Sequence, residues 1–157
     1  MTLAETLQQR LSGWTPSGTG RHTWSTPFEG WTVHIAADRN DSLSTLVWDL
    51  VLERNGPGPE GMTLKSWASD IAGRVSGLLE DLKVIEIDST RDEAILRSDE
   101  PSRRGDMLGF YELRLTGLDR ALLRRFKADT AAKTKREQVP FAVTHEVLGQ
   151  VAEDITG

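Results

Sequence analysis

The chain has 157 residues, of which 38% are hydrophobic and 27% are charged, and its formal net charge at pH 7 is -5. This length and composition are typical of a globular protein, so we expect a single domain over residues 1–157. The absence of cysteine excludes disulfides, thiolate metal sites and cysteine nucleophiles. The negative charge disfavours general affinity for nucleic acid or anionic membranes, so neither is an expected partner.

The N-terminal segment has the pattern of a short amphipathic helix. Thr2 and Glu5 have the spacing of a capping box, and Gly13 can end the helix. The segment lacks the uninterrupted apolar run of a signal peptide or a membrane span, so the expected location is the cytoplasm. One helical face carries its leucines, which are Leu3, Leu7 and Leu11.

Three strands are predicted next. Residues 21–26 are a candidate strand, residues 27–30 a turn, and residues 31–36 alternate apolar and polar side chains as a half-buried strand does. The third strand ends near Arg54 and has apolar residues on both faces, so we expect it near the centre of the sheet. The proline- and glycine-rich segment 55–61 follows it. One face of the third strand is predicted to carry Leu46, Trp48, Leu50 and Leu52.

The clearest periodic pattern in the chain runs from Leu64 to Leu82. Apolar residues recur there at three- and four-residue spacing, which predicts a central helix that covers the sheet, with Thr63 as its N-cap. Its apolar face comprises Leu64, Trp67, Ala68, Ile71, Ala72, Val75, Leu78, Leu79 and Leu82.

A second set of strands is predicted after the central helix. Residues 84–87 and 94–98 form one hairpin, an exposed loop covers 99–106, and residues 107–116 and 120–127 form a second hairpin. Residues 139–142 are extended around Pro140, and Thr144 caps a last helix that reaches Ile155. The fold class is therefore α+β: an antiparallel sheet with helices mainly on one face, in the order α-β-β-β-α-β-β-β-(β)-α.

Motifs for catalysis, cofactor binding or metal binding are not found in the sequence. The three histidines, His22, His34 and His145, lack ligand spacing, and no serine lies in a G-x-S-x-G context. Pro57 and Pro59 remove two N–H donors from the glycine-rich loop, so it does not resemble a phosphate cradle. We therefore predict no catalytic, cofactor or metal residues, and the sequence favours a non-enzyme while leaving an enzyme open.

Small residues interrupt the outer face of the predicted central helix. Each interior glycine destabilises a helix by about 1 kcal/mol relative to alanine. The presence of two glycines therefore suggests that small side chains are needed here, for example for the close approach of another backbone. A homodimer contact is one hypothesis, and ordinary solvent exposure is the other. The predicted interface consists of Ser66, Ser69, Gly73, Ser76 and Gly77.

The most basic stretch runs over residues 120–136 and includes a single aromatic residue, Phe126. Nucleic-acid modules usually add several stacking aromatics and a positive overall field, which are both missing here. A solvated strand face is one interpretation, and contact with an acidic protein partner is the other. The candidate partner contacts are Arg124, Arg125 and Lys127.

The order of predicted elements resembles that of the class I chaperones of type III secretion. The matching blocks are residues 3–11, 31–54, 64–82 and 144–155. This resemblance implies a homodimer built around the middle helix, and a sheet and first helix that bind an extended, non-globular segment of a secreted protein. A shared fold does not by itself establish a shared function.

Two hypotheses for function follow. The first is a non-catalytic, homodimeric interaction protein, chaperone-like, that binds an apolar protein segment by strand addition or in a groove. The alternative is a small-molecule-binding protein or enzyme that uses the concave face of the sheet. In that alternative, the wall of the site is formed by Trp24, Trp31 and Trp48. The polar contact to the ligand comes from one of His34, Asp49 or Tyr111.

Overall fold

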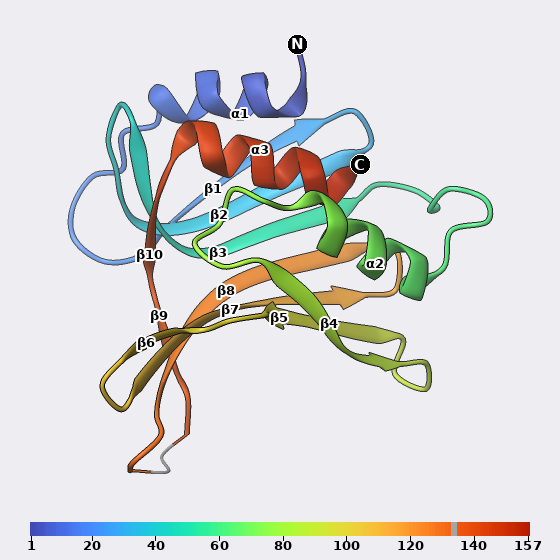
Figure 1. Ribbon diagram of the computed structural model, residues 1–157. Coiled ribbons are helices and arrows are strands. Elements are labelled where there is room, and N and C mark those ends of the chain that lie inside the picture. Colours follow the sequence, from blue (N-terminus) through green and yellow to red (C-terminus); the bar gives the residue numbers. More distant parts are fainter. Residues whose placement is uncertain (133–134) are drawn as a thin grey trace.

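The computed structural model describes residues 1–132 and 135–157. Within these ranges, three helices lie on one face of a ten-stranded sheet whose strand pairings are all antiparallel (Figure 1). The α+β fold and the predicted order of elements are confirmed. The helices are α1 (Leu3–Ser12), α2 (Leu64–Arg74) and α3 (His145–Thr156).

The sheet runs in the order β1-β2-β3-β8-β7-β5-β4, and three short strands lie off this path. β10 pairs with the first part of β3, β9 pairs with the last part of β8, and β6 pairs with β7. The strands are β1 (His22–Phe28), β2 (Trp31–Asn40), β3 (Ser44–Arg54), β4 (Leu82–Asp88), β5 (Glu93–Ser98), β6 (Ser102–Arg104), β7 (Met107–Thr116), β8 (Arg120–Asp129), β9 (Glu137–Val139) and β10 (Phe141–Thr144).

β9 and β10 fill a gap between two strands of the sheet. β3 pairs with β8 only over residues 50–53, and its earlier residues pair with β10 instead. Pro140 separates β9 from β10, which fits a residue that cannot donate to a strand ladder. The extended segment predicted at 139–142 is thus two short strands, and β6 lies within the predicted loop 99–106.

The hydrophobic core lies between the helices and one face of the sheet. Trp67 of α2 is fully buried against Trp31, and its indole Nε1 donates to the Ile155 carbonyl oxygen at 3.0 Å. α1 and α3 pack closely, because a Cβ at Gly149 would come within 2.6 Å of the Ala4 carbonyl oxygen. The predicted caps are confirmed at Thr2, Thr63 and Thr144, and Gly13 ends α1.

The central helix is shorter than its periodic pattern predicts, because α2 ends at Arg74 and not at Leu82. Val75 is already extended, and the following Ser76 and Gly77 are weak helix formers. Leu79, predicted to lie on the apolar face, is 79% exposed. The segment 75–81 instead crosses to the sheet, where Leu82 begins β4.

The alternation predicted for the third strand is wrong at its first half. Ala36 lies opposite Asp49 whereas Ala37 lies opposite Val47, so Trp48 is an extra residue at a β-bulge. Because of the bulge, the inward side chains are at odd positions before Trp48 and at even positions after it. Val47 therefore enters the core with Leu50 and Leu52, whereas Leu46 and Trp48 do not.

Among residues 1–132 and 135–157, no helix has the length and apolar character needed to cross a membrane.

Candidate functional site

The small residues predicted to form a dimer interface do not lie on one helical face. Ser66, Ser69 and Gly73 are exposed on α2, and the Ser66 hydroxyl is part of the N-terminal cap. Ser76 and Gly77 follow the end of the helix. A Cβ at Gly77 would lie 3.3 Å from Val147 Cγ1, so Gly77 faces α3 of the same chain. The exposed stripe is thus reduced to three residues.

The three predicted partner contacts point in different directions. Arg124 lies opposite Glu112 on the sheet face away from the helices, and its Nε donates to Asp49 Oδ1 at 2.7 Å. Arg125 lies opposite the core residue Tyr111 and therefore points to the helix side. Lys127 is on that same side and exposed. Lys133 of the basic stretch lies outside the described residues.

The residues of the predicted small-molecule site are dispersed. Trp31 packs against Trp67 in the core with the two rings tilted, and Tyr111 meets Phe141 edge-on, also in the core. Trp24 instead packs on Trp14. His34 and Asp49 lie on the opposite face of the sheet, each paired with a residue of the neighbouring strand, and Trp48 is covered by the Arg21 guanidinium at 4.1 Å.

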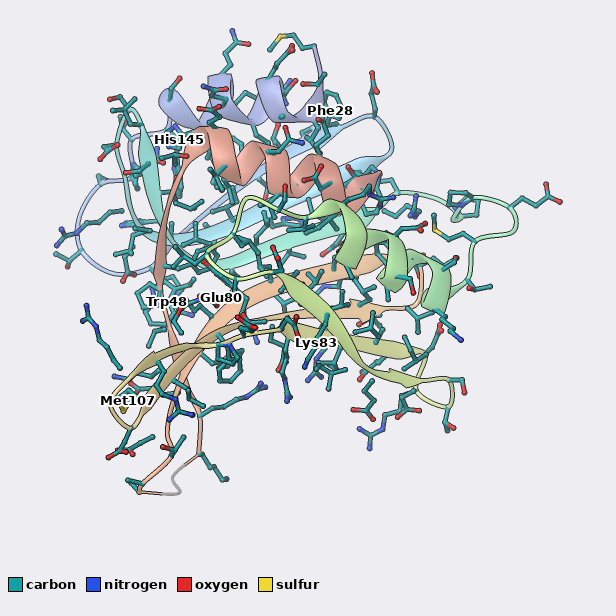
Figure 2. All side chains as sticks on the ribbon, in the orientation of Figure 1. Phe28, Trp48, Glu80, Lys83, Met107 and His145 are labelled. Carbon is teal, nitrogen blue, oxygen red and sulfur yellow. The ribbon has the colours of Figure 1, made fainter. Side chains whose placement is uncertain are left out.

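A buried ion pair fixes the segment between α2 and β4 to the sheet. Both carboxylate oxygens of Glu80 accept hydrogen bonds from Arg125, at 3.0 and 3.2 Å, and further bonds come from the hydroxyls of Ser98 and Ser102. The Arg125 guanidinium lies 4.4 Å from the Tyr111 ring centroid. It also lies over Gly109, where a Cβ would come within 2.9 Å of Nη2. Figure 2 shows Glu80 where this segment reaches the sheet.

Charge and hydrogen bonding keep Glu80 ionised. Burial alone would raise the pKa of Glu80, but the bonds from Arg125, Ser102 and Ser98 outweigh it and hold the pKa below the usual value. A paired, fully bonded carboxylate of this kind stabilises structure and has no free lone pair for proton transfer. We therefore assign Glu80 a structural role.

A shallow apolar groove lies beside this ion pair, at the end of the sheet that the helices do not cover (Figure 1). Its volume is about 430 Å³. Figure 2 places Met107 at this end, on the β6–β7 hairpin. We call this surface the terminal groove; it is lined by Ser102, Arg103, Arg104, Met107, Leu108, Gly109, Arg125, Phe126, Lys127 and Val139.

The rim of the terminal groove is cationic. Of its four basic residues, Arg125 is neutralised by Glu80, and Lys127 has a contact of 3.5 Å with the exposed Glu137. Arg103 and Arg104 are exposed on β6, and no carboxylate of the described residues forms an ion pair with either. The groove thus combines an apolar floor with unpaired positive charge, in a chain whose net charge is -5.

The sheet face away from the helices carries a second cluster of charges around Glu112. Its carboxylate accepts from Arg97 at 3.0 Å and from Arg136, whose guanidinium also stacks on Phe126. Burial alone would raise the pKa of Glu112, but Arg136 and Arg97 together hold it below the usual value. Arg114 approaches the same carboxylate at 3.7 Å.

A hollow of about 450 Å³ adjoins Glu112 on this face. Four arginines and two glutamates line it, so its lining has a positive net charge. We call this surface the arginine hollow; it is lined by Glu93, Glu112, Arg114, Thr116, Arg120, Leu122, Arg124, Phe126 and Arg136.

His145 connects α3 to the start of the chain. Its Nε2 bonds to Asn40 Oδ1 at 2.8 Å, and the Asn40 amide in turn donates to the carbonyls of Leu11 and Trp14. His145 is 2% exposed, and its Nδ1 has no hydrogen-bond partner among the described residues. Burial lowers the pKa of His145, against smaller opposing effects of the Ser44 carbonyl and Asp41. The described residues contain no cluster of three metal-ligating side chains.

Sequence reasoning missed both charged clusters and the groove. Glu80 lay within the predicted helix, so its contact with Arg125 was not foreseeable from spacing. Gly109 was a usable signal, because a glycine inside a strand often marks close approach of another group. The alternation of Glu112 and Arg114 on one strand opposite Arg124 on the next is a second signal, since it predicts cross-strand ion pairs.

Comparisons of this chain with protein-family models, with curated proteins and with solved structures found no match.

Proposed function

We propose that the protein is a non-catalytic binding protein whose terminal groove receives an extended segment of another protein. The observation that carries this proposal is the apolar floor of the groove, left uncovered by the helices, beside the unpaired Arg103 and Arg104. Uncovered apolar surface rimmed by polar residues is typical of protein interaction sites. The partner segment would carry apolar side chains alternating with Asp or Glu.

Charge complementarity favours an acidic partner. Arg103, Arg104 and Lys127 add positive charge at the rim, and the groove lining contains no acidic residue. Rim charges of this kind mainly accelerate association and exclude partners of like charge. Affinity would come from the apolar contacts with Met107 and Val139, which lie on the same side of the sheet as Arg125 and Lys127.

The resemblance to class I chaperones of type III secretion agrees with this proposal in the kind of ligand, whereas the binding surface that it implies, the sheet and first helix, differs from the terminal groove, which contains no residue of α1. Those chaperones bind an extended segment of a secreted protein, and the confirmed order of elements supports the comparison. The terminal groove of the present chain lies where β6, β7, β8 and β9 meet. We propose this location for the client segment of the present chain.

The experiment is a selection of random peptides displayed on phage against the purified full chain. We expect enrichment of peptides in which acidic and apolar residues alternate. The enriched peptides are then tested against Arg103→Glu/Arg104→Glu, in which two exposed rim charges are reversed. The affinity for these peptides should fall by about tenfold or more, because the acidic side chains of the peptide would then be repelled by the two new glutamates.

The matched control is Lys65→Glu/Arg91→Glu, which makes the same change in net charge at two exposed positions outside the groove. Binding to this control should match the unsubstituted chain within about twofold, because the substituted positions do not touch the peptide. Enrichment of basic peptides, or equal loss in both variants, would contradict the proposal.

A further inference from the structure

We propose that the arginine hollow binds a phosphate group of a small, non-aromatic molecule. This site lies on the sheet face opposite the helices, whereas the terminal groove involves the helix side through Arg125 and Lys127. The two linings share only Phe126, and the arginines substituted in each test line one surface and not the other, so either proposal can fail without the other.

The inner part of the cluster is already satisfied. Arg97 and Arg136 neutralise Glu112 through direct hydrogen bonds, and the Arg136 guanidinium is held against Phe126 at 4.0 Å. Both guanidinium groups are thus bound to Glu112. Arg136 and Glu112 line the hollow, but neither Arg97 nor Arg136 supplies its free donors.

The outer arginines have donors to spare. Arg114 reaches carboxylates only at 3.7 and 3.8 Å, and Arg120 only at 3.9 Å, so neither guanidinium donates a hydrogen bond to any residue that the structure describes. The side chains of both are 44% exposed. Arg124 uses its Nε for Asp49. Because the three line the same hollow, their remaining N–H groups can converge on one anion.

The geometry of the donors favours a phosphate over a single carboxylate. A planar guanidinium fork binds two oxygens of an oxyanion, and one carboxylate is saturated by one such fork. A phosphate monoester offers three oxygens and close to two negative charges, which matches several arginines around one hollow. The Thr116 hydroxyl, also in the lining, can add a further donor.

Stacking of a nucleobase is not supported. Phe126 is the aromatic residue of the lining, and its ring is flanked by the Arg136 guanidinium and by Phe110, whose centroid is 5.9 Å away. Protein sites for single-stranded nucleic acid usually provide free aromatic faces. The ligand is thus a phosphorylated molecule without a stacked base.

The test is isothermal titration calorimetry with inorganic pyrophosphate at low ionic strength. We expect saturable binding with one site per chain for the unsubstituted protein. Arg114→Gln/Arg120→Gln should weaken it by about tenfold or more, since two forks are lost. Glu112 keeps Arg97 and Arg136 in this variant, so the fold is retained, which circular dichroism can check. Arg114→Lys/Arg120→Lys keeps the charge but not the forks and should also bind more weakly.

The control is Lys65→Gln/Arg91→Gln, which removes the same charge away from the hollow and should bind as the unsubstituted chain does. Equal weakening in this control would overturn the proposal, because the effect would then be one of net charge. Absence of saturable pyrophosphate binding would also overturn it. If citrate binds as tightly as pyrophosphate, the hollow is a site for carboxylates and the proposal is wrong. If oligothymidylate binds more tightly than pyrophosphate, the hollow is a site for nucleic acid, which also contradicts the proposal.

Discussion

Glu80 and Arg125 form a two-point ion pair, at 3.0 and 3.2 Å, that attaches the segment between α2 and β4 to β8. Their side chains are 5% and 12% exposed. The pair also sets one wall of the terminal groove, because Arg125 lies over Gly109 and lines the groove. Stability and the candidate binding surface therefore depend on the same contact.

Replacement of Glu80 by Gln should be strongly destabilising. The substitution leaves the Arg125 guanidinium buried without a counter-charge, for which a loss of about 3 kcal/mol in the free energy of unfolding is typical. Urea denaturation measures this loss. The control is Glu137→Gln, which removes the exposed partner of Lys127 and should cost less than about 0.5 kcal/mol. Equal effects of the two substitutions would show that the Glu80 pair adds no particular stability.

Two helical glycines should respond oppositely to alanine. At Gly149 the new Cβ would meet the Ala4 backbone at 2.6 Å, so α1 and α3 must separate, at a cost of about 1–3 kcal/mol. At Gly73 nothing lies within 4 Å, so alanine should stabilise α2 by about 1 kcal/mol. Thermal unfolding followed by circular dichroism compares the two. A stabilising Gly149→Ala would contradict the close packing of α1 on α3.

The stability of the protein should decrease between neutral and mildly acidic pH because of His145. Burial lowers the pKa of His145 in the folded chain, so the unfolded chain binds its proton more readily. The free energy of unfolding is then highest above the unfolded pKa of about 6.5 and falls as the pH drops below it. Urea denaturation between pH 5 and 8 checks this. His145→Gln should flatten the dependence, and an unchanged slope would exclude His145 as its source.

A second loss of stability is expected at lower pH, from Glu112 and Glu80. The pKa of each is held below its usual value in the folded chain, so each contributes stability that is present above the unfolded pKa, about 4.3 for glutamate. This stability is lost as the pH falls through the folded pKa. Acid titration followed by tryptophan fluorescence detects the loss. Glu112→Gln should lower stability at pH 7 and make the acid transition shallower; a transition of unchanged steepness would mean that Glu112 does not contribute to it.

The homodimer inferred from the small residues of α2 is tested by Gly73→Glu. The position is open, so the substitution should leave the fold intact while placing a charge in any α2 contact between two copies. Sedimentation of the unsubstituted chain at micromolar concentration should give a dimer mass, and the variant a monomer mass. A monomer in both cases would contradict a dimer through Ser66, Ser69 and Gly73.

Most elements of this fold could be predicted because their signals are local. The capping residues Thr2, Thr63 and Thr144 and the alternation of β7 and β8 depend on neighbouring residues only. The end of α2 could not be predicted from periodicity, because it depends on distant contacts. Gly77 approaches α3, and Glu80 meets Arg125, 45 residues away.

The candidate surfaces were less predictable for a similar reason. The terminal groove is assembled from β6, β7, β8 and β9, so no single stretch of sequence carries its apolar pattern. Of the predicted partner contacts, Arg125 and Lys127 line the groove, whereas Arg124 lies in the arginine hollow. Two adjacent residues of a strand point to opposite faces, which divides a basic stretch between two surfaces.

The most direct test of the proposed function is a nuclear magnetic resonance titration of the ¹⁵N-labelled chain with an enriched acidic and apolar peptide. The account predicts saturable shifts of the amide signals of Leu108, Gly109 and Lys127, in the terminal groove, and no shifts in β1 or the exposed face of α2. Saturable shifts confined to β1, α1 or α2, with the groove signals unchanged, would contradict it.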